Sequence, residues 1–141
     1  MAEKEINNNA PFDYKTFESL SRLELEMFCS KKENQPGLDA SFLEYVRNNA
    51  QKFDDHHLQM ALYLLNVSKL HEGYREIVKY IEHPSRYVRF FAIKWITFLK
   101  DEDFDDLILN EAKRVMQKNI KNIEYVELKE RLEKLPGVTL E

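Results

Sequence analysis

Turn-forming residues, cysteine and long apolar runs are all scarce in this chain. Its 141 residues include three glycines, four prolines and one cysteine, Cys29. Because β-hairpins and tight turns use many glycines and prolines, their scarcity favours helices over sheets. A single cysteine excludes an internal disulfide framework and suits a reducing compartment. No stretch approaches the roughly 18 consecutive apolar residues that indicate a membrane span, so we expect none.

The charge balance is mildly acidic, which bears on the class of partner. The formal net charge is −4 at pH 7, and 43% of the residues are hydrophobic, enough for one buried core. General binding to a nucleic-acid backbone requires a basic surface, which the totals do not provide. The first residues, MAEKEINNNAP, contain no apolar run of the kind that a signal peptide needs. We therefore expect a cytoplasmic protein with a flexible lead over residues 1–11 and a single α-helical domain over residues 12–141.

Apolar residues recur at helical spacings along most of the chain, which predicts six to seven helices. Ser21 with Glu24 has the form of a capping box, so the first helical range is compatible with two short helices as well. Ser41 with Glu44 predicts another capping box, and Gly73 marks a join. The expected helical ranges are 13–31, 40–53, 55–70, 73–82, 85–99, 102–118 and 121–135.

The range 85–99 is the most apolar segment of the chain. Its centre reads YVRFFAIKWITFL, with apolar residues on nearly every side of the expected helix. A helix of this kind is typical of a buried core, so we predict that it forms the middle of the protein. Its β-branched and aromatic residues leave a strand as the rival prediction, although its length and the helical spacing on either side favour a helix.

Pairing the predicted helices gives hairpins of roughly thirty residues, a period typical of α-helical solenoids. Residues 77–99, IVKYIEHPSRYVRFFAIKWITFL, resemble a HEAT repeat. A small side chain such as Ala92 allows two helices to approach closely. The resemblance implies an all-α fold of antiparallel hairpins, stacked as a short HEAT-like α-solenoid or a compact bundle. The residues that carry it are Pro84, Val88, Arg89, Ala92, Ile96 and Leu99.

The resemblance also implies a class of function. HEAT-like units mostly bind proteins, and some related forms act on DNA. Small helical-repeat proteins also occur among bacterial immunity proteins of the contact-dependent inhibition type, which block a toxin domain by covering it. This chain is similar to them in size, acidity and lack of an active site. We therefore expect a non-enzymatic toxin inhibitor whose partner is a basic toxin domain, such as a nuclease. A HEAT-like nucleic-acid-binding protein, or a scaffold or regulatory subunit, is the alternative.

No motif in the sequence predicts catalysis, a cofactor or a metal site. Gly-rich phosphate loops, serine elbows and Cys-x-x-Cys pairs are absent from it. His56 and His57 are adjacent, so on a helix they point about 100° apart and do not easily share a metal ion. Cys29 has no neighbouring histidine, and a structural thiol is the simpler interpretation. His71 and His83 lie at predicted helix joins, where capping or ion pairing is expected.

We predict that polar residues on the second helix of each hairpin, together with acidic residues at helix starts, bind the partner. Acidic side chains at a helix start cap free N–H groups, and they also suit a basic partner because opposite charge speeds association. Arg89 has a second interpretation, an ion pair to the neighbouring hairpin that only holds the stack together. The predicted partner-binding residues are Asp54, Asp55, Gln59, Tyr63, Asn66, Arg86, Arg89, Asp101, Asp103, Asp105 and Asp106.

Overall fold

Helices account for every regular element that the structure describes. The computed structural model describes residues 12–35 and 38–138, so the predicted lead over residues 1–11 lies outside it. Within the described ranges the all-α prediction is confirmed, and the rival prediction of a strand at 85–99 is wrong.

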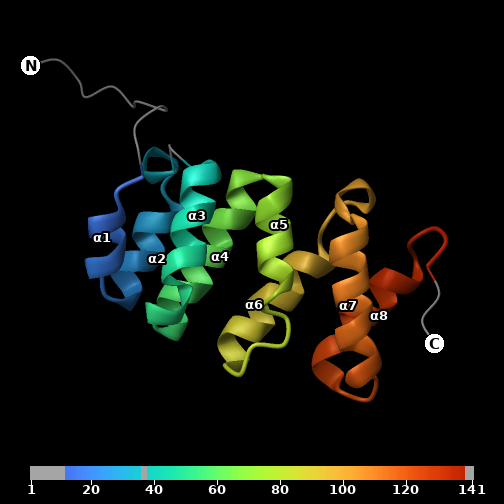
Figure 1. Ribbon diagram of the computed structural model, residues 1–141. Coiled ribbons are helices and arrows are strands. Elements are labelled where there is room, and N and C mark those ends of the chain that lie inside the picture. The colour runs from blue at the N-terminus through green and yellow to red at the C-terminus, as the bar shows by residue number, and fades with distance from the viewer. Residues whose placement is uncertain (1–11, 36–37, 139–141) are drawn as a thin grey trace, which may run out of the picture. The chain divides into compact units, whose positions relative to one another are not determined.

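The chain divides into two compact units. Unit 1 is Met1–Leu70 and unit 2 is His71–Glu141 (Figure 1). The single domain over residues 12–141 stays a prediction.

Unit 1 is built around a long helix, α4. Helices α2 and α3 both pack on α4 (Figure 1). Fully buried side chains from all four helices, among them Phe17, Leu25, Phe42 and Leu62, form its core. The helices of unit 1 are α1 (Tyr14–Ser19), α2 (Arg22–Ser30), α3 (Ala40–Asn49) and α4 (Asp55–Ser68), with short 3-10 helices η1 (Lys32–Asn34) and η2 (Ala50–Lys52).

Two helix starts in unit 1 differ from a simple capping box. Ser21 separates α1 from α2, which confirms the two-helix alternative, but its hydroxyl donates to Glu24 Oε1 at 2.6 Å and caps no backbone N–H. The capping box predicted at Ser41 and Glu44 is wrong, because Ser41 lies inside α3. The N-cap there is Asp39, whose carboxylate accepts a hydrogen bond from the Ser41 N–H at 2.9 Å. An aspartate two residues earlier thus caps the helix in place of the serine.

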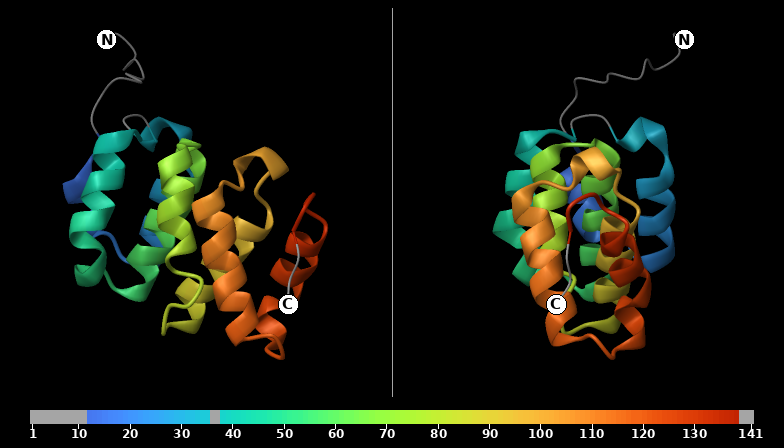
Figure 2. Two further views of the ribbon diagram at one scale, coloured as in Figure 1. Left: turned by 45° about the vertical axis from the view of Figure 1, so that its right-hand side comes forward. Right: turned by 90° about the vertical axis from the view of Figure 1, so that its right-hand side faces the viewer.

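Unit 2 contains two helical hairpins. Helix α5 packs on α6 and α7, and α8 packs on α6 and α7 (Figures 1 and 2). The first helices of the two hairpins are therefore neighbours, as are the second helices, an arrangement compatible with a helical repeat. Ala92, the small residue of the HEAT resemblance, is fully buried. The helices are α5 (His71–Val78), α6 (Arg86–Thr97), α7 (Asp106–Lys118) and α8 (Val126–Glu133), with 3-10 helices η3 (Asp101–Asp103) and η4 (Ile123–Tyr125).

The join predicted at Gly73 is wrong. Gly73 lies inside α5, which begins at His71 and ends at Val78, and the glycine is buried. Glycine weakens a helix interior by about 1 kcal/mol relative to alanine. Its place in a covered helix shows that packing, rather than local propensity, decides the structure at this point.

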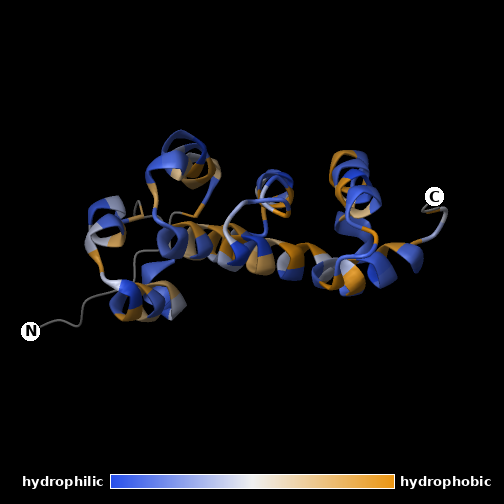
Figure 3. Cartoon of the chain, turned by 90° about the horizontal axis from the view of Figure 1, so that it is seen from below, coloured by the Kyte–Doolittle hydropathy of each residue, from blue (hydrophilic) through white to orange (hydrophobic). Residues whose placement is uncertain are grey.

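The prediction that residues 85–99 form the buried middle of the protein is only partly correct. Ala92 and Ile96 of α6 are fully buried, yet Tyr87, Phe90 and Phe98 at its end are 68%, 61% and 67% exposed. Within unit 2, α6 packs on α5 and α8. Apolar residues are interleaved with polar ones along the helices (Figure 3). Helix α6 carries more apolar side chains than α5 and α8 cover. Three aromatic side chains of this segment therefore remain exposed.

Candidate protein-binding surface

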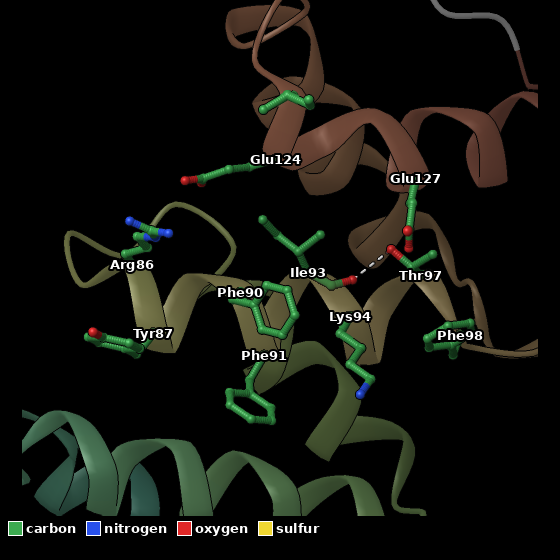
Figure 4. A pocket seen from close by; sticks show the side chains of 11 residues that line it. Arg86, Tyr87, Phe90, Phe91, Ile93, Lys94, Thr97, Phe98, Glu124 and Glu127 are labelled. Atoms are coloured by element: carbon green, nitrogen blue, oxygen red, sulfur yellow. Dashed lines mark hydrogen bonds between the residues drawn. The ribbon is translucent and has the colours of Figure 1, made fainter.

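An open pocket lies between α6 and the start of α8. Its volume is about 720 Å³. Tyr87 and Phe90 of α6 and Phe98 at its end line it (Figure 4). Ile123 of η4, which is 84% exposed, lines it as well. We call these four exposed apolar residues the α6–α8 face. Aromatic residues in such a position are typical of the centre of a protein interface.

Four charged residues that also line the pocket border the α6–α8 face in two rows. Arg86 and Lys94 come from α6 and form a basic row, whereas Glu124 and Glu127 come from η4 and α8 and form an acidic row. In Figure 4, Phe90 lies on α6 between Arg86 and Lys94, Glu124 lies at the Arg86 end and Glu127 lies at the Lys94 end. Basic residues therefore line the α6 side of the pocket, with Phe90 between them, and acidic residues line the opposite side.

Arg89 fixes the acidic row against α6. Its guanidinium donates two hydrogen bonds to the Glu124 carboxylate, at 2.6 and 3.0 Å, and one to the carbonyl of His83 at 2.9 Å. The hydrogen bond from Arg89 holds the pKa of Glu124 below its usual value, and the charges of Arg89 and Arg86 add to this effect against the opposing effect of burial. This is the ion pair that the second interpretation of Arg89 predicts, and it keeps Glu124 ionised.

Two further contacts tie the α7–α8 hairpin to the α5–α6 hairpin. The Tyr125 hydroxyl donates to the carbonyl of Ile81 at 2.7 Å, and both residues are buried. Arg131 donates to the carbonyl of Leu99 and to the Asp101 carboxylate, each at 2.6 Å. These contacts hold η4 and α8 against the segments that precede and follow α6. A preformed surface of this kind loses little conformational entropy when a partner binds.

The predicted aspartates of unit 2 gather at the start of α7, where Asp105 has a structural role. Its Oδ1 accepts the Ile108 N–H at 2.8 Å, and its Oδ2 lies 2.5 Å from both Arg75 Nε and His71 Nε2. Burial raises the pKa of Asp105, but the hydrogen bonds from Ile108, Arg75 and His71 outweigh that effect and lower it. Asp101 is held by Arg131, whereas Asp103 is half-buried and Asp106 is exposed.

The predicted residues of unit 1 lie on or beside α4. The Asp54 carboxylate caps the helix as expected, accepting the His57 N–H at 2.7 Å. The ring of His57 lies 2.9 Å from Asp54 Oδ1 through Nδ1 and 3.1 Å from the carbonyl of Phe17 through Nε2. Gln59 is buried. Of the remaining three, Asp55 is exposed, and Tyr63 and Asn66 are half-buried.

Among the predicted partner-binding residues, Arg86 lines the α6–α8 face. The sequence analysis did not predict the four apolar residues of the α6–α8 face, because an apolar residue in a helix is first assigned to the buried core. The all-round apolar character of the 85–99 segment was the available signal. A helix that meets neighbours on one side only must leave the surplus exposed.

Metal and membrane sites are absent from the described part of the chain. Residues 12–35 and 38–138 contain no cluster of three His, Cys, Asp or Glu side chains able to hold a metal ion. His56 Nε2 lies 3.8 Å from Glu26 Oε1, and burial raises the pKa of the Cys29 thiol to about 12. None of the helices in these ranges combines the length and apolar character that crossing a bilayer requires.

Comparison with known proteins returns no match to a family model, a curated protein or a solved structure. The HEAT resemblance therefore rests on residues 77–99 and on the paired hairpins of unit 2. Any argument about function rests on the geometry of the α6–α8 face.

Proposed function

We propose that this chain is a non-enzymatic protein-binding protein and that the α6–α8 face is its binding surface. The observation that carries the proposal is the group of three aromatic side chains and Ile123, exposed by 61–84% around one pocket. A large aromatic side chain presents about 150–250 Å², so three rings exposed by about two thirds offer about 300–500 Å² of apolar surface. Patches of that size on a monomer are often functional.

In its specific form, the proposal is an immunity protein that neutralises a toxin domain by covering its active surface. The net charge of −4 suits a basic partner such as a nuclease, because opposite charge speeds association and sharpens the choice of partner. Of the acidic row, Glu124 is paired with Arg89, and Glu127 remains to meet such a partner. The HEAT resemblance supports the same class of function.

A comparative pull-down tests the binding surface. The tagged chain, Phe90→Asp and Leu23→Asp are each incubated with lysate of the native cell and washed at high salt. Leu23 is the matched control, since it is 67% exposed but lies on α2. We expect one stoichiometric protein on the wild-type chain and on Leu23→Asp, and its loss from Phe90→Asp. If the chain captures only nucleic acid, and the high-salt wash removes it, the result would contradict the proposal.

Co-expression tests the immunity form. The captured protein is expressed alone in a bacterial host, then together with the wild-type chain or with Phe90→Asp. Growth arrest by the partner alone, relieved by the wild-type chain and not by Phe90→Asp, is the expected result. A partner that is harmless by itself would exclude the toxin inhibitor and leave a scaffold or regulatory role.

A further inference from the structure

We infer, on the basis of the proposed function, that the segment of the partner that binds the α6–α8 face is an amphipathic helix. This helix carries carboxylates along one edge of its apolar stripe and a basic residue on the other edge. The support comes from the apolar floor of the pocket, the helices that form its walls and the charges that remain unpaired around it.

The floor of the pocket suits apolar side chains. Ile93 and Thr97 line it, and each is 6% exposed. The Thr97 hydroxyl donates to the carbonyl of Ile93 at 2.7 Å (Figure 4), so this hydroxyl does not require a hydrogen bond from a partner. Phe90 and Ile123 lie exposed around the same pocket. A buried floor with satisfied polar groups and exposed apolar neighbours favours the apolar stripe of a partner.

The walls of the pocket favour a helix over an extended segment. A bound strand pairs its backbone with an exposed sheet edge, and residues 12–35 and 38–138 contain no strand. A helix bonds its own N–H and C=O groups internally, so only its side chains require contacts. Arg86, Phe90 and Lys94 lie four residues apart on α6. Side chains at this spacing form a ridge that fits a groove of another helix.

The unpaired charges specify the charges of the partner helix. Within the part of the chain that the structure describes, Arg86, Lys94 and Glu127 form no ion pair, whereas Glu124 is paired with Arg89. The two basic residues attract carboxylates on the side of α6, and Glu127 attracts a basic residue on the other side. The net charge of −4 acts on the partner as a whole during approach, but these local charges act on the segment that enters the pocket.

The spacing on α6 gives a sequence pattern for the partner. Arg86 and Lys94 are eight residues apart, which is about 12 Å along a helix that rises 1.5 Å per residue. A helix lying along α6 meets both with acidic residues two turns apart, and an apolar residue midway between them contacts Phe90. We expect Asp or Glu at each end of these two turns, an apolar residue between them, and Lys or Arg on the other edge.

Binding of designed peptides to the purified full-length chain tests this pattern. The probe is a fluorescently labelled, alanine-rich helical peptide with that pattern, and in the control peptide lysines replace its two acidic residues. Fluorescence anisotropy should give a dissociation constant of about 10–100 μM for the probe. The control peptide should bind at least about tenfold more weakly, because two attractions become repulsions. The net charge of −4 favours the lysine peptide, so only local charges produce the expected order.

Variants of the chain test the contacts themselves. Phe90→Asp should weaken binding of the probe at least about tenfold. Lys94→Glu should weaken it about fivefold and should strengthen binding of the lysine peptide. The matched control is Lys52→Glu, which makes the same change of charge at an exposed lysine of η2 that does not line the pocket. It should leave both affinities within about twofold. Phe90 and Lys94 are exposed, so their variants should fold, which circular dichroism verifies.

Three outcomes overturn the inference: no binding of the probe at about 1 mM, tighter binding of the lysine peptide to the wild-type chain, or equal effects of Lys94→Glu and Lys52→Glu. A labelled single-stranded oligonucleotide that binds more tightly than the probe also overturns it, since basic and aromatic residues together bind nucleic acids as well. If the probe fails while Phe90→Asp still loses the native partner in the pull-down, the partner helix is excluded and the proposed function stands. If Phe90→Asp keeps the native partner, the proposed function fails whatever the peptides do.

Discussion

Removing the Tyr125 hydroxyl should destabilise unit 2 by about 1–3 kcal/mol. Tyr125 is 2% exposed, Ile81 is fully buried, and the hydroxyl donates to the Ile81 carbonyl at 2.7 Å. In Tyr125→Phe the ring still fills its site, but the carbonyl loses its hydrogen-bond donor in a place that water does not reach. The cost is therefore the desolvation of one unpaired carbonyl, rather than the smaller net value of an exposed hydrogen bond.

Urea denaturation measures this cost, with Tyr87→Phe as the control. Both variants remove one hydroxyl from one ring of unit 2, but Tyr87 is 68% exposed, so its variant should change the free energy of unfolding by less than about 0.5 kcal/mol. With a urea slope of about 2 kcal/mol/M, the midpoint of Tyr125→Phe should fall by about 1 M. Equal midpoints for the two variants would refute the buried hydrogen bond as a tie between the hairpins.

Three other measurements test the structure. Ile96→Ala should cost about 2–5 kcal/mol because Ile96 is fully buried, whereas Ile123→Ala, at 84% exposure, should cost less than about 0.5 kcal/mol; similar costs would contradict the exposed face. The pKa values of Glu124 and Asp105 are lowered in the folded chain. Each ionised carboxylate therefore stabilises the folded chain fully above its usual pKa, which is 4.5 for Glu124 and 3.8 for Asp105, and this stabilisation is lost as pH falls through the lower folded pKa. The urea midpoint, measured between about pH 6 and pH 2, should decrease as the carboxylates become protonated, and it should decrease less steeply in Glu124→Gln. If the midpoint depends on pH equally in both chains, Glu124 does not contribute to this stabilisation. Cys29, whose pKa burial raises to about 12, should resist a thiol reagent at neutral pH until urea is added; rapid reaction of the native chain would show that the thiol is exposed.

Local interactions account for what could be predicted about the helices. Asp54 caps α4 at the predicted position, and Ser21 separates α1 from α2, because a helix start depends on side chains within three or four residues of it. Where two local signals compete, the sequence did not decide between them: Asp39, rather than Ser41, caps α3. Gly73 is buried inside α5 because α5 packs on other helices, and its local sequence does not predict this packing.

The candidate site was predicted only in part. Arg86 was named as a surface residue and lines the pocket. Other residues that were predicted to bind a partner form ion pairs within the fold instead: Arg89 with Glu124, and Asp105 with His71 and Arg75. Each of these partners lies at least 30 residues away along the chain, a distance at which helical periodicity carries no information.

The sequence by itself determined that this protein is all-α, where most of its helices lie, and that Ala92 allows a close approach between helices. Only the tertiary structure decided which side of α6 is covered. Its apolar residues surround the helix, so the pattern has no preferred face, and burial depends on where α5 and α8 pack. Ile96 is fully buried, whereas Phe90 on the same helix is 61% exposed. Local chemistry selects the helix, but neighbours distant in sequence decide which of its side chains become core and which become a binding surface.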